Sequence, residues 1–207
     1  MEDGSVPCGV GGLARTREEQ AAADVALPLA GFRRLLALGG RPKRLRGINI
    51  QRPWARLILE GTKTVEARKY ALKGYCNEDL WVIETKGGSK STLSLERGSV
   101  VGQAVAEQSA AARFVSRIVG VVRFESSFRY EDLAQWRADE CRHCIPNGSA
   151  FDWQGPSMTG KSEMHGWRVA SARALAEPQA GPAEKGMIGC KAITRMVLFA
   201  PRVEHPG

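Results

Sequence analysis

The stretch QRPWARLILEGTKTVEAR, residues 51–68, decides how this chain folds. Its first half carries Trp54, Leu57 and Ile58 at helical spacing, so that their side chains fall on one face of a helix. Gly61 then stands where the end of a helix favours a residue in the left-handed conformation. The sequence therefore predicts a helix of about two turns just before Gly61.

The second half of the stretch combines three charged side chains with a predicted strand over residues 63–68. It fits the pattern Gly, one residue, Lys, two residues, Glu, one residue, Arg. On a strand, Lys63 faces one side, whereas Glu66 and Arg68 face the other, about 7 Å apart, where they can pair or share a polar ligand. An arginine fork suits a phosphate or a base edge, and a glutamate accepts from an exocyclic amine. We therefore favour a binding site here over a purely structural cluster that holds the helix against the rest of the domain.

Short runs rich in Val, Ile and aromatic residues predict further strands on both sides of this stretch. They cover residues 48–50, 80–84, 99–106, 118–124, 166–170 and 187–199. One more helix is expected over residues 130–140, where Leu133 and Trp136 lie three residues apart on one face. Many short strands with few helices favour an α+β, mainly β fold, built as a barrel or a curled sheet.

The opening of the predicted domain resembles that of the ASCH family, a branch of the PUA-like superfamily. The resemblance rests on the turn QRPW at residues 51–54, the helix after it, and the Gly-Lys-Glu-Arg pattern of residues 61–68. It continues at residues 165–169, which are similar to a late Trp-containing strand of the family, and at residues 175–190, which are similar to its closing strands. It is strongest over residues 48–70. The resemblance implies a curled PUA-like β-barrel with one or two short flanking helices.

The family resemblance implies that the chain binds RNA or a nucleotide, because the related PUA domains bind RNA. The residues expected to line that site are Arg52, Trp54, Lys63, Thr64, Glu66, Arg68, His165 and Trp167. Two positions depart from the family pattern, since Arg52 stands in place of a Gln and Cys190 in place of a late Trp. RNA or a modified nucleoside is thus the expected partner, with no cofactor and no metal.

The family also implies two other functions. One bacterial branch hydrolyses N4-acetylcytidine with a Lys, a Thr and a Glu; its Lys falls on Lys63, but its Thr falls on Glu66, which departs from the pattern. If the chain is an amidohydrolase, Lys63 and Glu66 are the expected catalytic residues, and Lys63 needs a lowered pKa to act as base or nucleophile. Resemblance to ASCH-containing coactivators favours instead a protein-interaction module in a transcriptional assembly, with a protein partner.

Trp54 and Trp167 have two interpretations. A tryptophan beside the charged residues could supply the stacking plane that readers of single-stranded RNA need. Large apolar rings are mostly buried, however, so the core is the favoured place for each tryptophan taken alone.

Three segments are expected: an N-terminal extension over residues 1–44, the domain over residues 45–200 and a flexible tail over residues 201–207. The extension is rich in Gly, Ala and Arg, so we expect it to be disordered or loosely helical, with a linker at residues 39–44. Leu35, Leu36 and Leu38 offer only a small apolar face. Deletion of residues 1–43 is therefore expected to leave the melting temperature nearly unchanged.

The composition describes an ordinary globular protein with a basic surface. The chain has 207 residues, with 30 Lys and Arg against 22 Asp and Glu, for a net charge of +8. Residues 1–46 hold 8 of the basic and 5 of the acidic residues, so the predicted domain is itself basic and attracts phosphate. No apolar run approaches the roughly 18 residues that a membrane helix needs, and no secretory signal is evident. We expect a cytoplasmic or nuclear location without membrane contact.

The five cysteines show no disulfide-like spacing and are expected to be reduced thiols. Cys141-Arg142-His143-Cys144 invites comparison with a zinc site. A structural zinc site needs four ligands, usually as two such pairs, so a loop with incidental thiols is favoured.

Overall fold

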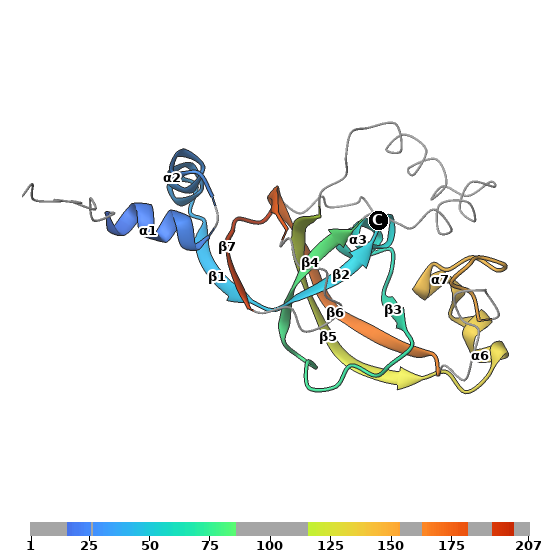
Figure 1. The fold of residues 1–207 in the computed structure, drawn as a ribbon. Coiled ribbons are helices and arrows are strands. Elements are labelled where there is room, and N and C mark those ends of the chain that lie inside the picture. The colour runs from blue at the N-terminus through green and yellow to red at the C-terminus, as the bar shows by residue number, and fades with distance from the viewer. Residues whose placement is uncertain (1–15, 26, 86–115, 154–162, 182–191, 201–207) are drawn as a thin grey trace, which may run out of the picture.

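Five strands of the protein form one curled sheet (Figure 1). The structure is a computed structural model that describes residues 16–25, 27–85, 116–153, 163–181 and 192–200. Across the sheet the strands run in the order β2 (Gly47–Gln51), β4 (Asp79–Thr85), β5 (Arg117–Arg129), β6 (His165–Ala180) and β3 (Val65–Arg68). The β2–β4 pair is parallel, and the other pairs in this sheet are antiparallel. The predicted mainly β fold with few short helices is therefore confirmed.

The curled sheet is not closed into a barrel. β2 and β3 are its two edge strands, and no strand pairing joins them in the part of the chain that the structure describes. Arg68 of β3 reaches across, and its guanidinium donates to the carbonyl oxygen of Asn49 on β2 at 2.8 Å. The predicted barrel is thus a curled open sheet, because a side chain rather than a strand ladder connects its edges here.

Each face of the sheet packs against its own apolar cluster. The inner cluster joins Ile48 and Val82 of the sheet to Ile58 of helix α3 (Trp54–Leu59), and all three are fully buried. The outer cluster includes the buried Trp81 and the ribbon of β1 (Arg41–Leu45) and β7 (Ile193–Val197). Trp81 donates its indole N–H to the carbonyl oxygen of Ile193 at 3.0 Å, which fixes the ribbon on that face.

Helix α3 lies against β5 at Gly120. A Cβ atom at this position would stand 2.4 Å from a methyl carbon of Leu59 and 2.6 Å from the carbonyl oxygen of Arg173. Real Cβ contacts are not that short. The Leu59 methyl group can move aside, but the Arg173 carbonyl belongs to the backbone of β6, so a larger residue would push β5 and β6 apart.

Two helices, not one, occupy the segment predicted as a helix over residues 130–140. α6 spans Leu133–Ala138 and α7 spans Glu140–His143, with Asp139 between them. The carboxylate of Asp132 accepts from the N–H of Gln135 at 2.8 Å, so this N-cap sets the start of α6 later than predicted. Trp136, on the predicted apolar face, is fully buried.

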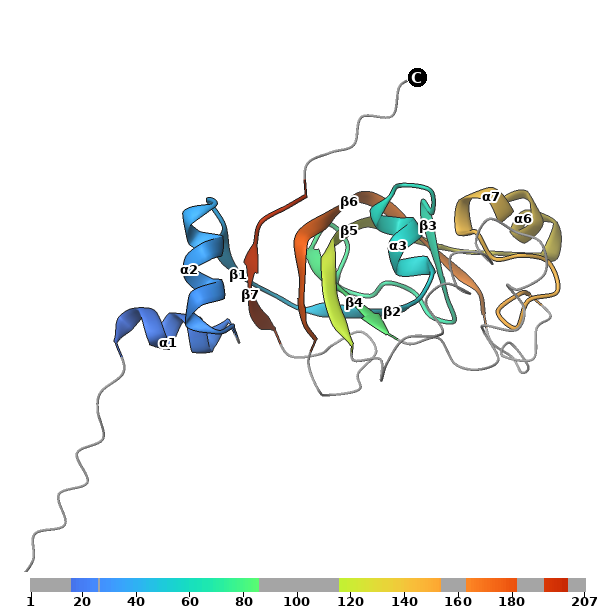
Figure 2. The same cartoon turned by 90° about the horizontal axis from the view of Figure 1, so that it is seen from above.

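The N-terminal segment forms two helices and a strand. α1 (Arg17–Asp24) and α2 (Leu29–Ala37) precede β1, which pairs with β7 along its whole length. Both helices lie beyond the β1–β7 ribbon, on the side away from the five-stranded sheet (Figure 2). The predicted linker at residues 39–44 is wrong, because most of it belongs to β1.

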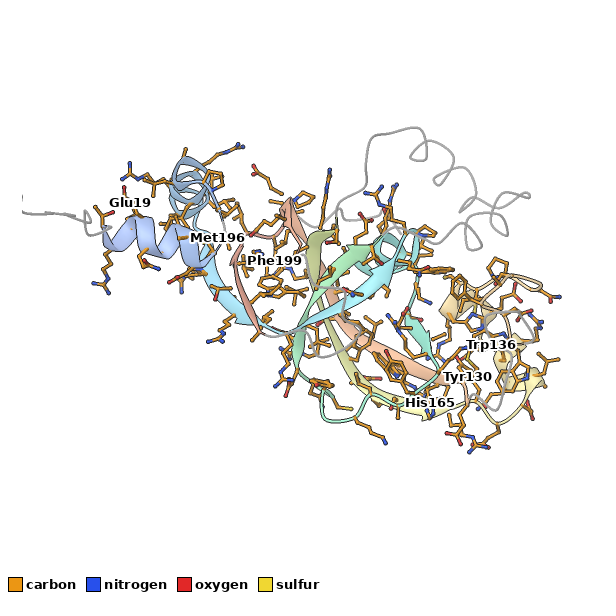
Figure 3. All side chains as sticks on the ribbon, viewed as in Figure 1. Glu19, Tyr130, Trp136, His165, Met196 and Phe199 are labelled. Atoms are coloured by element: carbon orange, nitrogen blue, oxygen red, sulfur yellow. The ribbon has the colours of Figure 1, made fainter. Side chains whose placement is uncertain are left out.

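Met196 of β7 connects the N-terminal helices to the ribbon (Figure 3). It is fully buried in a cluster with Phe32 and Leu35 of α2. Of the three leucines predicted to form the apolar face, only Leu35 is buried, whereas Leu36 and Leu38 are 40% and 56% exposed. Phe32 and Leu35, three residues apart, form the buried face instead. Because α2 packs on β7, there is no longer a physical reason to expect that deletion of residues 1–43 leaves the melting temperature unchanged.

Some predictions fall outside the described residues. These are the strand over residues 99–106, the first part of the strand over 187–199 and the tail over 201–207. The domain boundary at residue 45 stays a prediction. None of the described helices has the length and apolar character needed to cross a membrane.

Candidate functional site

A glycine turn carries the charged residues to the edge of the sheet. Gly61, just after α3, has a φ of 82°, a conformation that side chains disfavour. The chain then turns back, and the N–H of Lys63 donates to the carbonyl oxygen of Leu57 at 3.0 Å. β3 begins two residues later. The glycine predicted to end the helix is thus confirmed in that role.

The side chain of Lys63 is buried, with only 1% exposed. Its ammonium group donates to the carbonyl oxygen of His143 and lies 3.5 Å from Oε2 of Glu66. Burial lowers the pKa of Lys63, and the charge of Glu66 opposes that shift. The prediction that Lys63 and Glu66 face opposite ways is wrong, because Lys63 precedes β3 and the alternation of a strand does not reach it.

Glu66 and Arg68 form the predicted ion pair. A terminal nitrogen of Arg68 lies 2.8 Å from Oε1 of Glu66 and 2.8 Å from the carbonyl oxygen of Asn49. The guanidinium carbon lies 5.7 Å from the ring centroid of Trp167. The Lys63–Glu66–Arg68 cluster therefore places two cationic side chains around one carboxylate, an arrangement suited to an additional anionic or hydrogen-bonding group.

The pairing of β3 with β6 brings two more predicted residues to the cluster. Arg68 lies opposite His165, and Glu66 lies opposite Trp167. Figure 3 labels His165 at the start of β6, where its Nε2 lies 3.4 Å from a carboxylate oxygen of Glu163. The structure thus brings Lys63, Glu66, Arg68, His165 and Trp167 into one region.

Trp54 and Trp167 belong to the core. They are 7% and 0% exposed. The indole N–H of Trp167 donates to the carbonyl oxygen of Tyr70 at 3.0 Å, and that of Trp54 donates to Cys144 at 3.4 Å. The favoured placement of each tryptophan in the core is therefore confirmed, and packing against the inner cluster leaves neither ring as an open stacking plane.

Thr64 and Arg52 contact other parts of the fold, and their place in the site stays a prediction. Thr64 contributes its backbone: its N–H donates to Arg142 at 3.0 Å, and its carbonyl oxygen accepts from Val169 at 2.9 Å. A terminal nitrogen of Arg52 lies 2.7 Å from Oε2 of Glu84 on β4. Arg52 is thus held at the neighbouring strand by an ion pair.

The end of α7 holds the cluster through three successive carbonyl oxygens. Those of Arg142, His143 and Cys144 accept from the Thr64 N–H, the Lys63 ammonium and the Trp54 indole respectively. Cys144 has a φ of 54°, which ends the helix in the left-handed conformation. Sequence reasoning missed this support because the partners stand 80 or so positions apart in the chain.

His143 is a neutral, buried histidine. Its Nδ1 accepts from the N–H of Ile145 at 3.0 Å, so its Nε2 carries the proton and donates to the carbonyl oxygen of Trp136 at 3.0 Å. The imidazole stacks on Trp136 with ring centroids 3.9 Å apart. Burial lowers the pKa of His143 to about 4. His143 therefore fixes the backbone that holds Lys63.

Two buried polar atoms beside Trp167 have no hydrogen-bond partner among the described residues. They are Nε of Arg68 and the hydroxyl of Tyr70. The Tyr70 ring lies edge-on to Trp167, with centroids 5.6 Å apart. Because buried polar groups are almost always paired, these atoms mark where a ligand could bond. Sequence reasoning missed Tyr70, because it lies two residues beyond the end of β3, where the alternation of the strand no longer applies.

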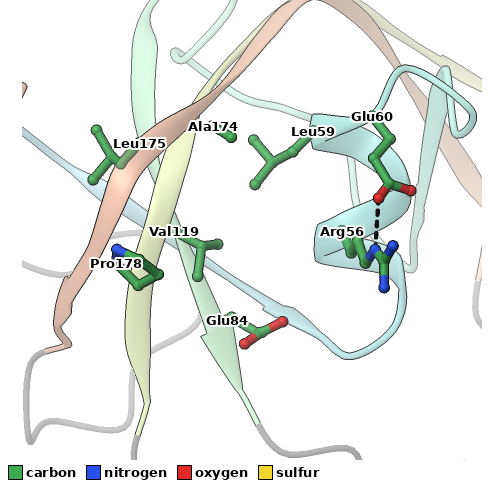
Figure 4. A pocket seen from close by; sticks show the side chains of 8 residues that line it. All are labelled: Arg56, Leu59, Glu60, Glu84, Val119, Ala174, Leu175 and Pro178. Carbon is green, nitrogen blue, oxygen red and sulfur yellow. Dashed lines mark hydrogen bonds and ion pairs between the residues drawn. The ribbon is translucent and has the colours of Figure 1, made fainter. Parts of the chain in front are cut away.

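A separate hollow of about 310 Å³ lies between α3 and the sheet (Figure 4). It is lined by Arg56, Leu59, Glu60, Glu84, Val119, Ala174, Leu175 and Pro178. Its walls are mostly apolar, with the exposed Arg56–Glu60 ion pair on the helix side. No member of the Lys63–Glu66–Arg68 cluster lines it, so the hollow and the charged cluster are distinct features.

The thiols do not gather into a metal centre in the described residues, where no group of three His, Cys, Asp or Glu side chains could hold an ion. Cys76, Cys141 and Cys144 are free. The thiol of Cys144 donates to the carbonyl oxygens of Cys141 and Thr62, at 3.5 and 3.8 Å.

Comparison with known proteins gives one family and one set of similar structures. The sequence model described as the ASCH domain matches residues 48–179, more than half of the chain. The crystal structure of ASCH from Zymomonas mobilis is similar at a TM-score of 0.42 and 15% identity, over 64% of this chain and 71% of that chain. Two point mutants of that protein give TM-scores of 0.42 and 0.36 at 15% and 12% identity, over 64% of this chain and 71% and 73% of theirs. No curated protein matches the chain.

Proposed function

This chain belongs to the ASCH domain family, and we propose that it is a binding module that holds RNA or a modified nucleoside at the Lys63–Glu66–Arg68 cluster. Glu66 would accept from an exocyclic amine of a base, and Arg68 would donate to a base oxygen or a phosphate.

The observation that carries the proposal is the incomplete bonding of the buried polar groups around Trp167. Arg68 already bonds Glu66 and Asn49 through one nitrogen, while its Nε and the hydroxyl of Tyr70 have no partner among the described residues. Leaving a buried polar group unpaired costs about 1 to 3 kcal/mol. A ligand that bonded these two groups would regain that free energy, and the two cationic groups of the cluster favour a ligand with acceptor or anionic atoms.

Lys63 has a positioning role in this proposal. Its ammonium is buried, donates to the carbonyl oxygen of His143 and forms an ion pair with Glu66. Lys63 therefore helps to set the orientation of the Glu66 carboxylate without being exposed to a ligand. Arg68, with 15% of its side chain exposed, is the cationic member that a ligand would reach. We therefore expect Arg68→Ala to weaken binding more than Lys63→Ala does, provided that both variants are folded.

The proposal is tested by measuring the affinity of a panel of nucleosides and short RNAs for the wild type and three variants, Lys63→Ala, Glu66→Gln and Arg68→Ala. Loss of a charge-assisted bond should weaken binding to Arg68→Ala by at least tenfold. Glu66→Gln should change which base is preferred, because it replaces a pure acceptor with an amide. Circular dichroism checks the fold of each variant. Wild-type affinity in all three variants would show that the cluster is structural.

A second candidate function, amidohydrolysis of an N4-acylated cytidine, is favoured by the environment of Lys63. Burial lowers the pKa of Lys63, which raises the fraction of neutral amine that can act as a base or nucleophile. A carboxylate lies 3.5 Å away, in Glu66, where the hydrolase branch has a threonine. Acetate release from N4-acetylcytidine, measured beside affinity on the same proteins, separates the two functions. An enzyme would lose acetate release in Lys63→Ala, whereas a binding module would release none in any variant.

A further inference from the structure

The junction between β1 and β2 is strongly basic. Within the six residues 41–46, four side chains are cationic: Arg41, Lys43, Arg44 and Arg46. All four are exposed. Along β1 they alternate: Arg41 and Lys43 lie on the face of Val197, whereas Arg44 lies on the face of Met196. None of the four lines the hollow between α3 and the sheet.

Neighbouring segments add to this charge. Lys73 in the loop before β4 is exposed, and Arg123 of β5 shares the carboxylate of Asp79 with Lys43. Asp79 therefore neutralises only one of its two partners. The acidic residues nearby are Glu78 and Asp79. The four cations of residues 41–46, together with Lys73 and Arg123, make six positive charges against these two negative charges, so the junction keeps a surplus of positive charge.

Arg46 contacts an aromatic ring. Its guanidinium carbon lies 5.6 Å from the ring centroid of Tyr75, and one terminal nitrogen donates to the Tyr75 hydroxyl at 3.1 Å. Arg46 remains exposed. A guanidinium supported in this way offers a planar surface on which an unpaired base can stack, and its charge attracts the adjacent phosphate.

The junction leads directly to the Lys63–Glu66–Arg68 cluster. Arg46 precedes β2 by one residue, and Asn49 of β2 accepts from Arg68. Three residues of extended chain span about 10 Å. A short single strand could therefore place one base at the cluster and its backbone on the junction.

We propose that the exposed residues Arg41, Lys43, Arg44 and Arg46 form a track for the sugar–phosphate backbone of single-stranded RNA, with Arg46 on Tyr75 as a stacking platform. This inference rests on the proposed function of the cluster, and it adds a second contact region. The track supplies most of the salt-dependent affinity, whereas the cluster supplies the choice of base.

The test compares two double variants of the full chain that lose the same charge at different places. Arg44→Gln with Arg46→Gln removes two cations from the track. Arg33→Gln with Arg34→Gln removes two exposed cations from α2, where their side chains are 60% and 68% exposed. The probe is a short, fluorescently labelled single-stranded RNA of mixed sequence, titrated at several salt concentrations.

The track variant should bind this RNA at least tenfold more weakly than the wild type. Its slope of log K against log salt should be smaller by about 1.4, because each phosphate contact on a single strand contributes about 0.7. The α2 variant should stay within about twofold of the wild type. Equal losses in both variants would mean that net charge alone attracts RNA, and would overturn the track.

Nucleoside binding distinguishes failure of the track from failure of the proposed function. The track variant should bind single nucleosides as the wild type does, because the cluster is intact. If the wild type binds a nucleoside but binds the RNA no more tightly, the track is wrong and the proposed function stands. If the wild type binds neither, both proposals are wrong.

Discussion

Arg68 serves both the sheet and the candidate site. It bonds the backbone of Asn49 on the opposite edge strand and the carboxylate of Glu66 on its own strand. Both contacts use one terminal nitrogen of the planar fork, so its Nε is left to point elsewhere. A lysine would supply one compact charge and could not reproduce that geometry. The residue that connects the two edges of the open sheet is thus also the one that presents an unpaired donor.

Tyr70→Phe should separate binding from stability. Its buried hydroxyl has no partner among the described residues, so its removal should leave the free energy of unfolding unchanged or raise it by up to about 1 kcal/mol. Nucleoside affinity should nevertheless fall several-fold, because the ligand loses a bond. Chemical denaturation and calorimetric titration measure the two effects. Tyr75→Phe, which loses an exposed bond to Arg46, is the control and should bind nucleosides normally. Normal affinity in Tyr70→Phe would remove Tyr70 from the site.

His143 should make stability fall in weak acid. Burial lowers its pKa to about 4 in the folded protein, whereas an unfolded histidine titrates near 6.5. Between these values the unfolded chain binds a proton that the folded chain does not, so the free energy of unfolding falls as pH drops from about 6.5 to about 4. The full effect is on the order of 3 kcal/mol, and none of it is felt above about pH 6.5. Denaturation across this range should show a shallower dependence in His143→Gln; identical curves would contradict the assignment.

The sequence predicted the charged residues better than their geometry. The Glu66–Arg68 pair follows from the alternation of a strand, and it is present. The orientation of Lys63 was wrong because the strand begins two residues after it. The contact of Lys63 with His143 could not be predicted, since no local pattern relates residues that stand 80 positions apart.

At the scale of elements, α3 positions the site. The helix buries Trp54 and Ile58 in the inner cluster and turns at Gly61 to deliver Lys63 to its place before β3. Its outer side carries the exposed Arg56–Glu60 pair. Local signals predicted this element well, because the apolar residues at helical spacing and the glycine that ends the helix all lie within a few residues of one another in the sequence. α7 was harder to predict, since its four residues depend on tertiary contacts more than on any helix signal.

Ile58→Ala should destabilise the protein strongly. The side chain is 0% exposed and packs in the inner cluster, so the truncation removes buried methyl groups and leaves a cavity. Such a change costs roughly 2 to 5 kcal/mol of unfolding free energy. Urea denaturation of the variant gives the value. Arg56→Ala, on the exposed side of the same helix, should stay within about 0.5 kcal/mol of the wild type. A loss of that small size for Ile58→Ala would mean that α3 does not pack as described.

At the scale of the whole molecule, the N-terminal helices and the sheet are connected through the β1–β7 ribbon. One face of the ribbon packs on the outer face of the sheet, and Met196 on the other face packs under α2. The sequence did not predict this arrangement. The apolar residues of residues 17–37 are few, and they form a cluster only when two helices and β7 come together.

Deletion of residues 1–43 should lower the melting temperature by about 5 °C or more. It exposes Met196 and removes the partner of most of β7, and exposing one such side chain costs about 1.5 to 3 kcal/mol. Differential scanning calorimetry of the truncated and full chains measures the shift. Phe32→Ala in the full chain should show part of the same loss. An unchanged melting temperature after the deletion would show that α2 and β1 add no stability.

The claim that the Lys63–Glu66–Arg68 cluster binds a nucleotide is tested most directly by the effect of nucleosides on the melting temperature of the wild type and of Arg68→Ala. A ligand that binds only the folded protein raises the melting temperature in proportion to its affinity. We expect at least one nucleoside, with cytidine and N4-acetylcytidine in the panel, to raise the melting temperature of the wild type by several degrees. The same nucleoside should leave that of Arg68→Ala unchanged. An equal rise in both proteins would place the ligand elsewhere, and no rise in the wild type with any nucleoside or short RNA would contradict the account.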